Sequence, residues 1–144
     1  MIESKQKGII TELQCITCFN QLGYKISIPY GENSRYDFIA DIDGKLIRIQ
    51  VKTSHLIDEN SIQFACRSTS SNSQKSKNKR YTDKEIDYFC TFYNQQSYLV
   101  PVTECSCDKR LWFANPKNNQ KTNISYARDY ELEIQIERIK LIKN

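Results

Sequence analysis

Glycine, proline and histidine are scarce in this sequence, and long hydrophobic runs are missing. The 144 residues include 4 Gly, 3 Pro and 1 His, with 39% hydrophobic and 26% charged residues. This composition excludes a low-complexity or disordered chain and indicates a globular one. No apolar stretch approaches the roughly 18 residues of a membrane-spanning helix, so no membrane-spanning helix is expected.

The first residues also lack the basic and then apolar pattern of a signal peptide. We therefore expect a cytoplasmic protein whose 6 cysteines stay reduced. A chain of this length is expected to form a single domain over residues 1–144. Lys and Arg outnumber Asp and Glu by 21 to 17, a net charge of +4, which permits a polyanionic partner without requiring one.

The spacing of apolar residues predicts one helix followed by a mostly antiparallel sheet. A helix is expected at 5–22, with its apolar residues on one buried stripe: Ile9, Ile10, Leu13, Ile16, Phe19 and Leu22. Period-two patterns predict strands in several further segments: 24–30, 61–68, 87–94, 97–102 and 110–116. The final residues, 126–144, fit either a strand or a helix. The fold class is α/β, in the mixed α+β sense.

A basic segment at about 69–80 has no periodicity and is predicted to be a loop. It carries four cationic side chains: Lys75, Lys77, Lys79 and Arg80. Such a segment is ordinarily a solvated turn. In a DNA-cutting protein it would instead follow phosphates as an arm that becomes ordered on binding. Charge alone does not decide between these interpretations.

A β-hairpin is predicted by the stretch RYDFIADIDGKLIRIQVKTS, which has an Asp-Gly pair at its centre. Asp43-Gly44 between two alternating runs is a strong signal for a two-residue turn. With those residues at the tip, Asp37 lies opposite Gln50, and Lys52 shares the face of Gln50 because side chains alternate. Opposed residues have Cβ atoms about 4.5–5.5 Å apart, so an acid, an amide and an amine converge.

The opposite face of the hairpin is apolar and is expected to face the core: Tyr36, Phe38, Ala40, Ile42, Ile47, Ile49 and Val51. Arg48 shares the polar face and is a candidate DNA phosphate contact, with Arg67 a weaker one. Glu12 neighbours Ile9 and Ile16 on the predicted helix, so its carboxylate should point toward the protein body and need a partner. Carboxylate and amide oxygens suit a hard cation such as Mg²⁺.

An acid before a hairpin turn and a lysine on the return strand resemble the signature of the PD-(D/E)XK nuclease superfamily. The matching residues are Tyr36-Asp37 and Gln50-Val51-Lys52. Glutamine at the position of the usual acid is similar to the group I intron-encoded homing endonucleases of this superfamily, as are QVKTS, EIDYFCTFYN with SYLVPV, and NISYARDYEL. The usual proline before the acid is replaced by Tyr36. The resemblance implies a restriction-endonuclease-like core, with the N-terminal helix packed on a mixed, mostly antiparallel sheet.

The resemblance also implies a role for each site residue. Asp37 is the central metal ligand, Glu12 completes the acidic site, and Gln50 and the backbone carbonyl of Val51 also ligate Mg²⁺ (or Mn²⁺). Lys52 assists the attacking water. The expected activity is Mg²⁺-dependent, site-specific hydrolysis of double-stranded DNA, with a homing role favoured. Cutting two strands requires at least two sites, so a homodimer or homotetramer is expected.

Other interpretations of the same residues stay open. The Asp37–Gln50 face also fits a solvated hairpin surface, and Glu12 fits one half of a salt bridge. Gln50 would also fit a catalytically inactive DNA-binding module with the nuclease fold. A Holliday-junction-resolvase-like or restriction-type nuclease would carry the same motif. His55, the single histidine, is expected at the surface, with a general base of another nuclease type as the alternative.

The cysteines allow a further alternative, a structural zinc site. Cys15 and Cys18 form one close pair, and Cys105 and Cys107 form another. The first pair falls inside the predicted helix without a turn, and the second has an unusual spacing for zinc. Reduced structural cysteines are therefore the favoured interpretation.

Overall fold

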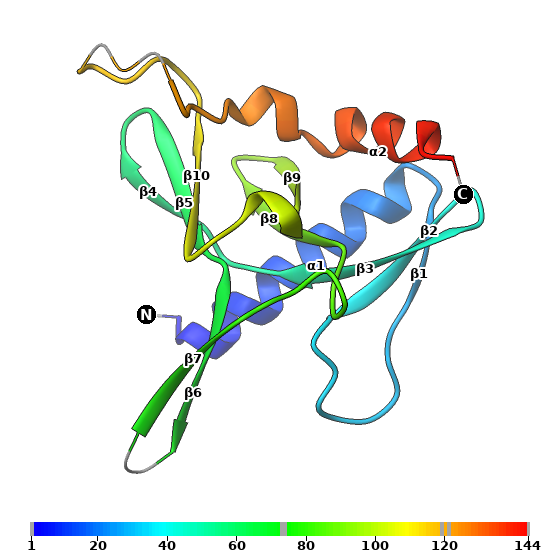
Figure 1. Cartoon of the computed structure of the whole chain (residues 1–144). Helices are drawn as coiled ribbons and strands as arrows, with labels where there is room; N and C mark the ends of the chain where they lie inside the picture. Colours follow the sequence, from blue (N-terminus) through cyan, green and yellow to red (C-terminus); the bar gives the residue numbers. More distant parts are fainter. Residues whose placement is uncertain (1, 73–74, 119, 121, 144) are drawn as a thin grey trace.

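The computed structural model describes residues 2–72, 75–118, 120 and 122–143, with side chains described outside 69–78. Figure 1 shows the arrangement of its elements. In chain order they are α1 (Ser4–Gln21), β1 (Lys25–Ser27), β2 (Phe38–Ile42), β3 (Lys45–Val51), β4 (His55–Asp58), β5 (Ser61–Ala65), β6 (Arg67–Asn72), β7 (Lys75–Arg80), β8 (Tyr88–Tyr93), β9 (Gln96–Pro101), the 3-10 helix η1 (Val102–Glu104), β10 (Asp108–Trp112), the 3-10 helix η2 (Ala127–Tyr130) and α2 (Leu132–Leu141).

The central sheet has the strand order β1-β2-β3-β8-β9. Only its β3–β8 pairing is parallel, and the other pairings are antiparallel. The predicted mixed, mostly antiparallel sheet is therefore confirmed. The turn between β2 and β3 is formed by Asp43 and Gly44, whose φ angles of 52° and 92° are left-handed as this tight turn requires. The resulting register pairs Phe38 with Ile49 and Asp41 with Leu46, as the sequence predicts.

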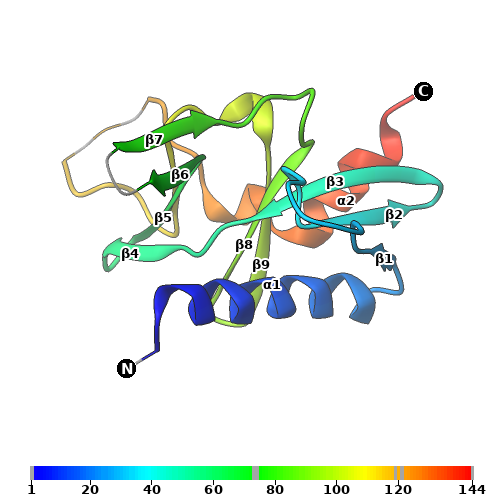
Figure 2. The ribbon, with the colours of Figure 1, turned by 90° about the horizontal axis from the view of Figure 1, so that it is seen from below.

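The basic segment predicted to be a loop is instead an antiparallel hairpin formed by β6 and β7. Figure 1 shows this hairpin projecting from the body at the lower left, and Figure 2 shows it on the opposite side of the strands from α1. Serine, lysine and asparagine give no hydrophobic alternation, so the strand pairing has no signature in the sequence. A separate three-stranded sheet has the order β10-β5-β4. Its strands β4 and β5 precede the hairpin in the chain, and β10 follows it.

Helix α1 has the predicted extent but a different buried face. Its fully buried residues are Thr11, Cys15 and Phe19, whereas Ile9 and Leu13 are 57% and 58% exposed. The predicted stripe is therefore wrong for Ile9 and Leu13, whereas its member Phe19 is buried as expected. The helix packs along β8 and β1, where the small side chains at positions 11 and 15 allow a close approach. The four-residue spacing of the buried positions is still that of one helix face.

Two hydrophobic clusters form the interior. The first joins both helices to the central sheet through twelve buried residues: Cys15, Phe19, Phe38, Ala40, Ile42, Ile49, Val51, Cys90, Leu99, Leu132, Ile136 and Ile139. The second cluster is centred on Phe64, Phe89 and Leu111. Tyr36, predicted beside Phe38 on the core face, packs against this second cluster instead, because β2 begins only at Phe38 and the alternation does not extend back to position 36.

The ambiguous C-terminal segment forms a helix. In α2, Leu132, Gln135, Ile136 and Ile139 are buried, and this spacing follows the helical period. Ile134, which belongs to the alternative strand pattern, is 44% exposed. Within the described residues, neither helix is long and apolar enough to cross a membrane.

The orientation of α1 can be tested with two substitutions on the same helix. Phe19 is fully buried and meets the Phe38 ring edge-on, with centroids 5.6 Å apart. Phe19→Ala should lower the free energy of unfolding by about 3–5 kcal/mol because it leaves a core cavity. The control Leu13→Ala, on the exposed face, should change it by less than about 0.5 kcal/mol. Urea denaturation measures both, and equal losses would contradict the orientation described.

Candidate active site

Asp37 lies immediately before β2, at the open end of the β2–β3 hairpin. The regular strand pairing ends at Phe38 and Ile49. Beyond it, the Asp37 N–H donates to the Ile49 carbonyl at 2.7 Å, and the Val51 N–H donates to Asp37 Oδ2 at 2.7 Å. Asp37 therefore stands beside Gln50 without forming the ladder pair predicted from the register. The Asp37 carboxylate accepts the Val51 N–H in place of a backbone carbonyl of the neighbouring strand, and this hydrogen bond fixes the orientation of the carboxylate.

The Asp37 carboxylate is electrostatically strained. Burial raises its pKa, and the hydrogen bond from the Val51 N–H and the positive charge of Lys52 lower the pKa only in part. The net direction is upward. A buried acid in this condition holds its negative charge more easily when a cation lies beside it.

Lys52 follows β3 directly and shares this environment. Burial lowers its pKa, the charge of Asp37 raises it, and the charge of Arg35 lowers it. Its backbone N–H donates to the Cys90 carbonyl at 2.9 Å, and its ammonium donates to the Arg67 carbonyl at 3.1 Å. The structure thus brings the predicted acid and the predicted amine close enough for the charge of each to shift the pKa of the other.

Gln50 and the Val51 carbonyl lie side by side. Nε2 of Gln50 donates to the Val51 oxygen at 3.3 Å, a long contact between adjacent residues. A glutamine amide has one donor and one acceptor end, and its acceptor end is the one that a metal ion binds. In this arrangement the amide nitrogen, and not the carbonyl oxygen of Gln50, faces the Val51 carbonyl, so the role of these two oxygens as metal ligands stays a prediction.

Glu12 reaches the site from α1. Burial and the nearby charge of Asp37 both raise its pKa, so the two carboxylates act on each other although they come from different elements. The adjacent Thr11 is 5% exposed, and its hydroxyl lies 3.1 Å from that of Thr53. This contact ties α1 to the segment that follows Lys52. Sequence reasoning did not assign Thr11 or Thr53 a role, and only the position of Thr53 directly after the motif lysine could have indicated one.

Arg48, a predicted DNA contact, is engaged within the protein. Its guanidinium bonds both carboxylate oxygens of Asp87 at 3.0 and 3.1 Å and the carbonyls of Asp83 and Lys84 at 2.9 and 2.6 Å. These bonds fasten β3 to the segment that leads into β8. A phosphate contact by Arg48 stays a prediction and would compete with them.

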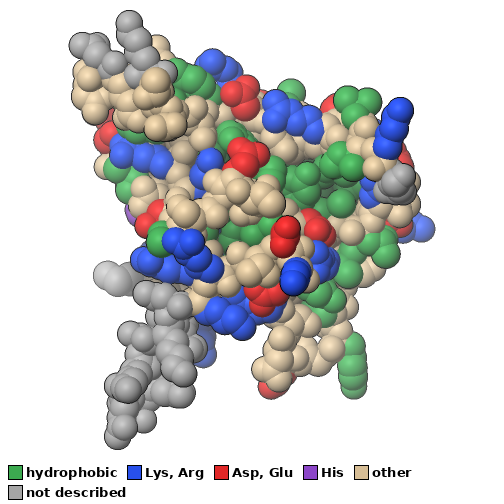
Figure 3. All heavy atoms as spheres, in the orientation of Figure 1, with side chains coloured by type: hydrophobic (Ala, Val, Ile, Leu, Met, Phe, Trp, Pro, Cys, Tyr) green, Lys and Arg blue, Asp and Glu red, His purple; other side chains and the backbone are tan. Residues whose placement is uncertain are grey.

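The remaining predicted DNA contacts lie on the β6–β7 hairpin. Arg67 and Arg80 are paired at its base. Lys79, whose side chain is 69% exposed, approaches Glu85 at 4.0 Å. Figure 3 shows Lys and Arg side chains clustered at this base, with acidic side chains beside them. Lys75 and Lys77 belong to β7 by their backbones, but their side chains lie outside the described part of the structure.

Arg35 and Tyr81 border the site and were not identified from the sequence. The Arg35 guanidinium lies 3.7 Å from the centre of the Tyr81 ring, and the Lys52 ammonium lies 5.0 Å from the same ring. Arg35 stands two residues before the motif acid, and Tyr81 follows the basic hairpin. Neither position carries a recognisable motif, so the sequence offered no signal beyond proximity to Asp37.

The zinc alternative is not supported by the placement of the cysteines. Cys15 lies in the first core together with Cys90, whose thiol is directed at the Thr91 carbonyl. Cys105 packs on the second core, where its thiol donates to the Pro101 carbonyl at 3.5 Å. Among the described residues, no three Asp, Glu, His or Cys side chains form a group that would hold a metal ion. His55 is exposed in β4, as expected, and a general-base role for it stays a prediction.

The residues at the hairpin end nevertheless fit a hard divalent cation. Glu12 and Asp37 would supply carboxylates; burial and then the charge of Asp37 raise the pKa of Glu12, and a cation beside both acids would offset these effects. Gln50 and the Val51 carbonyl would supply neutral oxygens, so this donor set contains only two acids. One or two carboxylates with further neutral oxygens is the donor set that Mg²⁺ takes in proteins.

Comparisons with known proteins identify the family and the fold. A family model described as PD-(D/E)XK endonuclease matches residues 2–133. A solved structure, "The structure of a bacterial homing endonuclease: I-Ssp6803I", superposes with a TM-score of 0.74 at 20% identity, covering 99% of this chain and 100% of that one. No curated protein sequence is significantly similar to this chain. The expected restriction-endonuclease-like fold is thereby confirmed.

Restoring a carboxylate at position 50 tests the proposed ligand set. Gln50→Glu adds a negative charge beside Asp37 and should tighten Mg²⁺ or Mn²⁺ binding roughly tenfold, equivalent to about 1.4 kcal/mol. Gln21→Glu, at the exposed end of α1, adds the same charge elsewhere and should leave the affinity unchanged. Isothermal titration calorimetry with each metal provides the measurement. Looser binding by Gln50→Glu would remove Gln50 from the ligand set.

Proposed function

The chain belongs to the PD-(D/E)XK endonuclease family, and on that premise we propose that it is a Mg²⁺-dependent, site-specific endonuclease that cuts double-stranded DNA. The observation that carries the proposal is the meeting of Asp37, Lys52 and Glu12 at one end of the hairpin. Each of these groups has a pKa that is displaced by burial and by another member of the set. Displaced pKa values in a group of acids and a lysine are typical of catalytic sites.

Glu12, Asp37, Gln50 and the Val51 carbonyl would hold the metal. When bound, Mg²⁺ or Mn²⁺ supplies a Lewis acid and lowers the pKa of water. Asp37 is already oriented for this role by the Val51 N–H.

Lys52 would act on the water and on the phosphate. Its pKa is lowered by burial, so its amine exchanges a proton closer to neutral pH than an exposed lysine does. In the hydrolysis a bond forms between the water oxygen and phosphorus as the water gives up a proton, and the bond from phosphorus to one sugar oxygen breaks as that oxygen takes up a proton from solvent. A lysine beside the phosphate would stabilise the negative charge that grows on its oxygens.

The β6–β7 hairpin would contact the duplex. Arg67, Lys79 and Arg80, together with Lys75 and Lys77, are the proposed phosphate contacts, and Arg48 is a further candidate. Lys79 and Arg80 are exposed at the base of the hairpin, and cations of this kind bind phosphates irrespective of base sequence. DNA affinity should therefore fall with rising salt.

A homing role is favoured within this proposal over a restriction or junction-resolving role. The structural match to a bacterial homing endonuclease supports it at the level of the fold, and the motif glutamine supports it at the level of the site. A homodimer or homotetramer would supply the two active sites that a double-strand cut needs. That residues 1–144 form a single domain, and that the protein is cytoplasmic, stay predictions.

Cleavage of a plasmid library that carries a randomised duplex insert tests the function. Wild-type protein with Mg²⁺ should linearise a fraction of the plasmids, and sequencing the ends gives the target. Asp37→Ala and Lys52→Ala should each reduce the cleavage rate by roughly 10²- to 10⁴-fold while duplex binding persists. Lys25→Ala and Asp129→Ala, which change exposed residues away from the site, should cleave normally. Binding without cleavage at any Mg²⁺ or Mn²⁺ concentration would instead identify an inactive DNA-binding module.

A further inference from the structure

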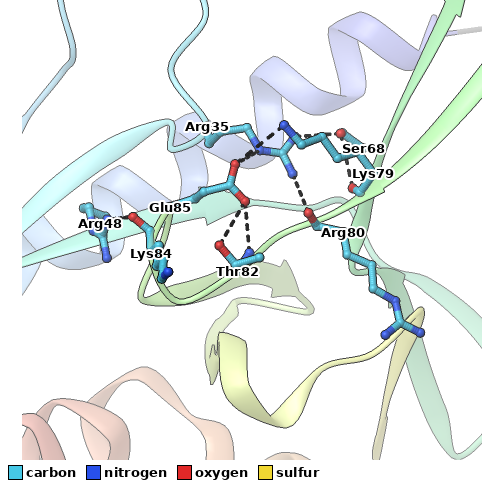
Figure 4. Close-up of polar contacts among 8 residues, drawn as sticks. All are labelled: Arg35, Arg48, Ser68, Lys79, Arg80, Thr82, Lys84 and Glu85. Carbon is cyan, nitrogen blue, oxygen red and sulfur yellow. Dashed lines mark hydrogen bonds and ion pairs between the residues drawn. The ribbon is translucent and has the colours of Figure 1, made fainter.

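Arg35 is the centre of a polar network between the candidate site and the base of the β6–β7 hairpin (Figure 4). Its Nε bonds Glu85 Oε2 at 2.8 Å, its Nη1 bonds the Ser68 hydroxyl at 2.7 Å, and its Nη2 bonds the Arg80 carbonyl at 2.9 Å. All three nitrogens of the guanidinium therefore have a protein acceptor. The side chain is 22% exposed.

The hairpin base is held from the catalytic side by two cations. Arg67 and Arg80 are directly paired at the base. The Arg67 carbonyl accepts from the Lys52 ammonium at 3.1 Å, and the Arg80 carbonyl accepts from Arg35. The two residues of this one cross-strand pair are thus bound through their carbonyls, Arg67 by the candidate catalytic lysine and Arg80 by Arg35.

The Tyr81 ring connects these two cations. It stands 3.7 Å from the Arg35 guanidinium and 5.0 Å from the Lys52 ammonium, both within the range of cation–π attraction. The ring is fixed in turn by Phe89, which it meets edge-on at 5.4 Å and which is 1% exposed. A rigid aromatic ring therefore sets where both cations can lie.

Glu85 compensates the second positive charge. One of its carboxylate oxygens binds Arg35, and the other accepts from the Thr82 N–H at 3.1 Å and hydroxyl at 3.2 Å. Without this carboxylate, only Asp37, which lies beside Lys52, would offset the repulsion between Arg35 and Lys52. The acid is itself pinned, so Arg35 has one favoured orientation.

We propose that Arg35 is a positioning residue for DNA cleavage, which locks the β6–β7 hairpin and Lys52 into one unit through Tyr81 and Glu85. The inference rests on the proposed nuclease function and extends it: the arm that would bind the duplex is placed relative to the lysine that acts on the phosphate. Arg35 does not bind phosphate in this assignment, because its nitrogens are already taken by the protein.

The assignment requires an arginine rather than any cation. A guanidinium presents donors in a fixed planar fork and stacks on an aromatic ring, whereas an ammonium is a single flexible point charge. Lysine at position 35 would keep the charge but lose the simultaneous bonds to Glu85, Ser68 and the Arg80 carbonyl. A phosphate contact, by contrast, would largely tolerate lysine.

The test compares Arg35→Gln and Arg35→Lys with wild-type protein on a duplex recovered from the randomised library. Arg110→Gln is the matched control, because Arg110 also lies over an aromatic ring, Trp112, at 4.0 Å and also pairs with an acid, Asp58, at 2.9 Å. Single-turnover cleavage at saturating duplex is measured with Mg²⁺. Duplex affinity is measured against salt concentration without Mg²⁺.

Both Arg35 variants should cleave roughly 10- to 100-fold more slowly at saturating duplex, because a small misplacement of a reacting group has an effect of that size. In both Arg35 variants, duplex affinity should fall with rising salt concentration as steeply as in wild type. The control Arg110→Gln should cleave at the wild-type rate. An unchanged cleavage rate in Arg35→Gln overturns the inference. The inference is also overturned if the slope of log affinity against log salt concentration is smaller by about 0.9 in Arg35→Gln, the value for one lost phosphate contact, and returns to the wild-type slope in Arg35→Lys.

Two milder variants keep the inference testable if circular dichroism shows Arg35→Gln to be unfolded. Ser68→Ala and Glu85→Gln each remove one partner of Arg35 and should each slow cleavage at saturating duplex, and normal rates in both would overturn the inference. Wild-type activity is measured in the same assay. A wild-type protein that binds but does not cut overturns the nuclease proposal itself, whereas a wild type that cuts beside fully active Arg35 variants overturns only the role of Arg35.

Discussion

The hydrogen bond from the Val51 N–H to the Asp37 carboxylate is the interaction on which the site depends. It is a short bond between a backbone donor and a charged acceptor, a type roughly twice as strong as a neutral bond. It joins the residue before β2 to the last residue of β3, where the regular ladder has already ended. Because β3 is flanked by β2 on one side and β8 on the other, Gln50 and Lys52 have little freedom to move away from that acid.

The site stores electrostatic strain that its chemistry can use. Two acids and a lysine are buried in part, and burial is the largest influence on the pKa of each. The pKa values of Glu12 and Asp37 are raised in the folded protein, so ionising these acids costs more free energy in the folded than in the unfolded chain. A protein that retains such groups gives up stability at its functional site, as is common where binding or catalysis requires it.

Sequence reasoning predicted the parts of the fold that rest on local chemistry. The Asp43-Gly44 turn fixed the hairpin register, and alternation then placed Phe38 and Ile49 in the core. It failed for α1, where small polar and thiol side chains are buried while Ile9 stays exposed, because the choice of face depends on how closely the helix can approach the sheet. The β6–β7 hairpin and the Arg35 network depend on backbone pairing and long-range contacts, which leave no periodic trace.

The shape of the β6–β7 hairpin has a mechanical consequence. Six residues of extended chain span roughly 20 Å, and the hairpin is anchored at its base by bonds to two carbonyls. The base of the hairpin therefore cannot shift without stretching the hydrogen bonds from the Lys52 ammonium and the Arg35 guanidinium, so the placement of the strand pair and the placement of the two cations are coupled.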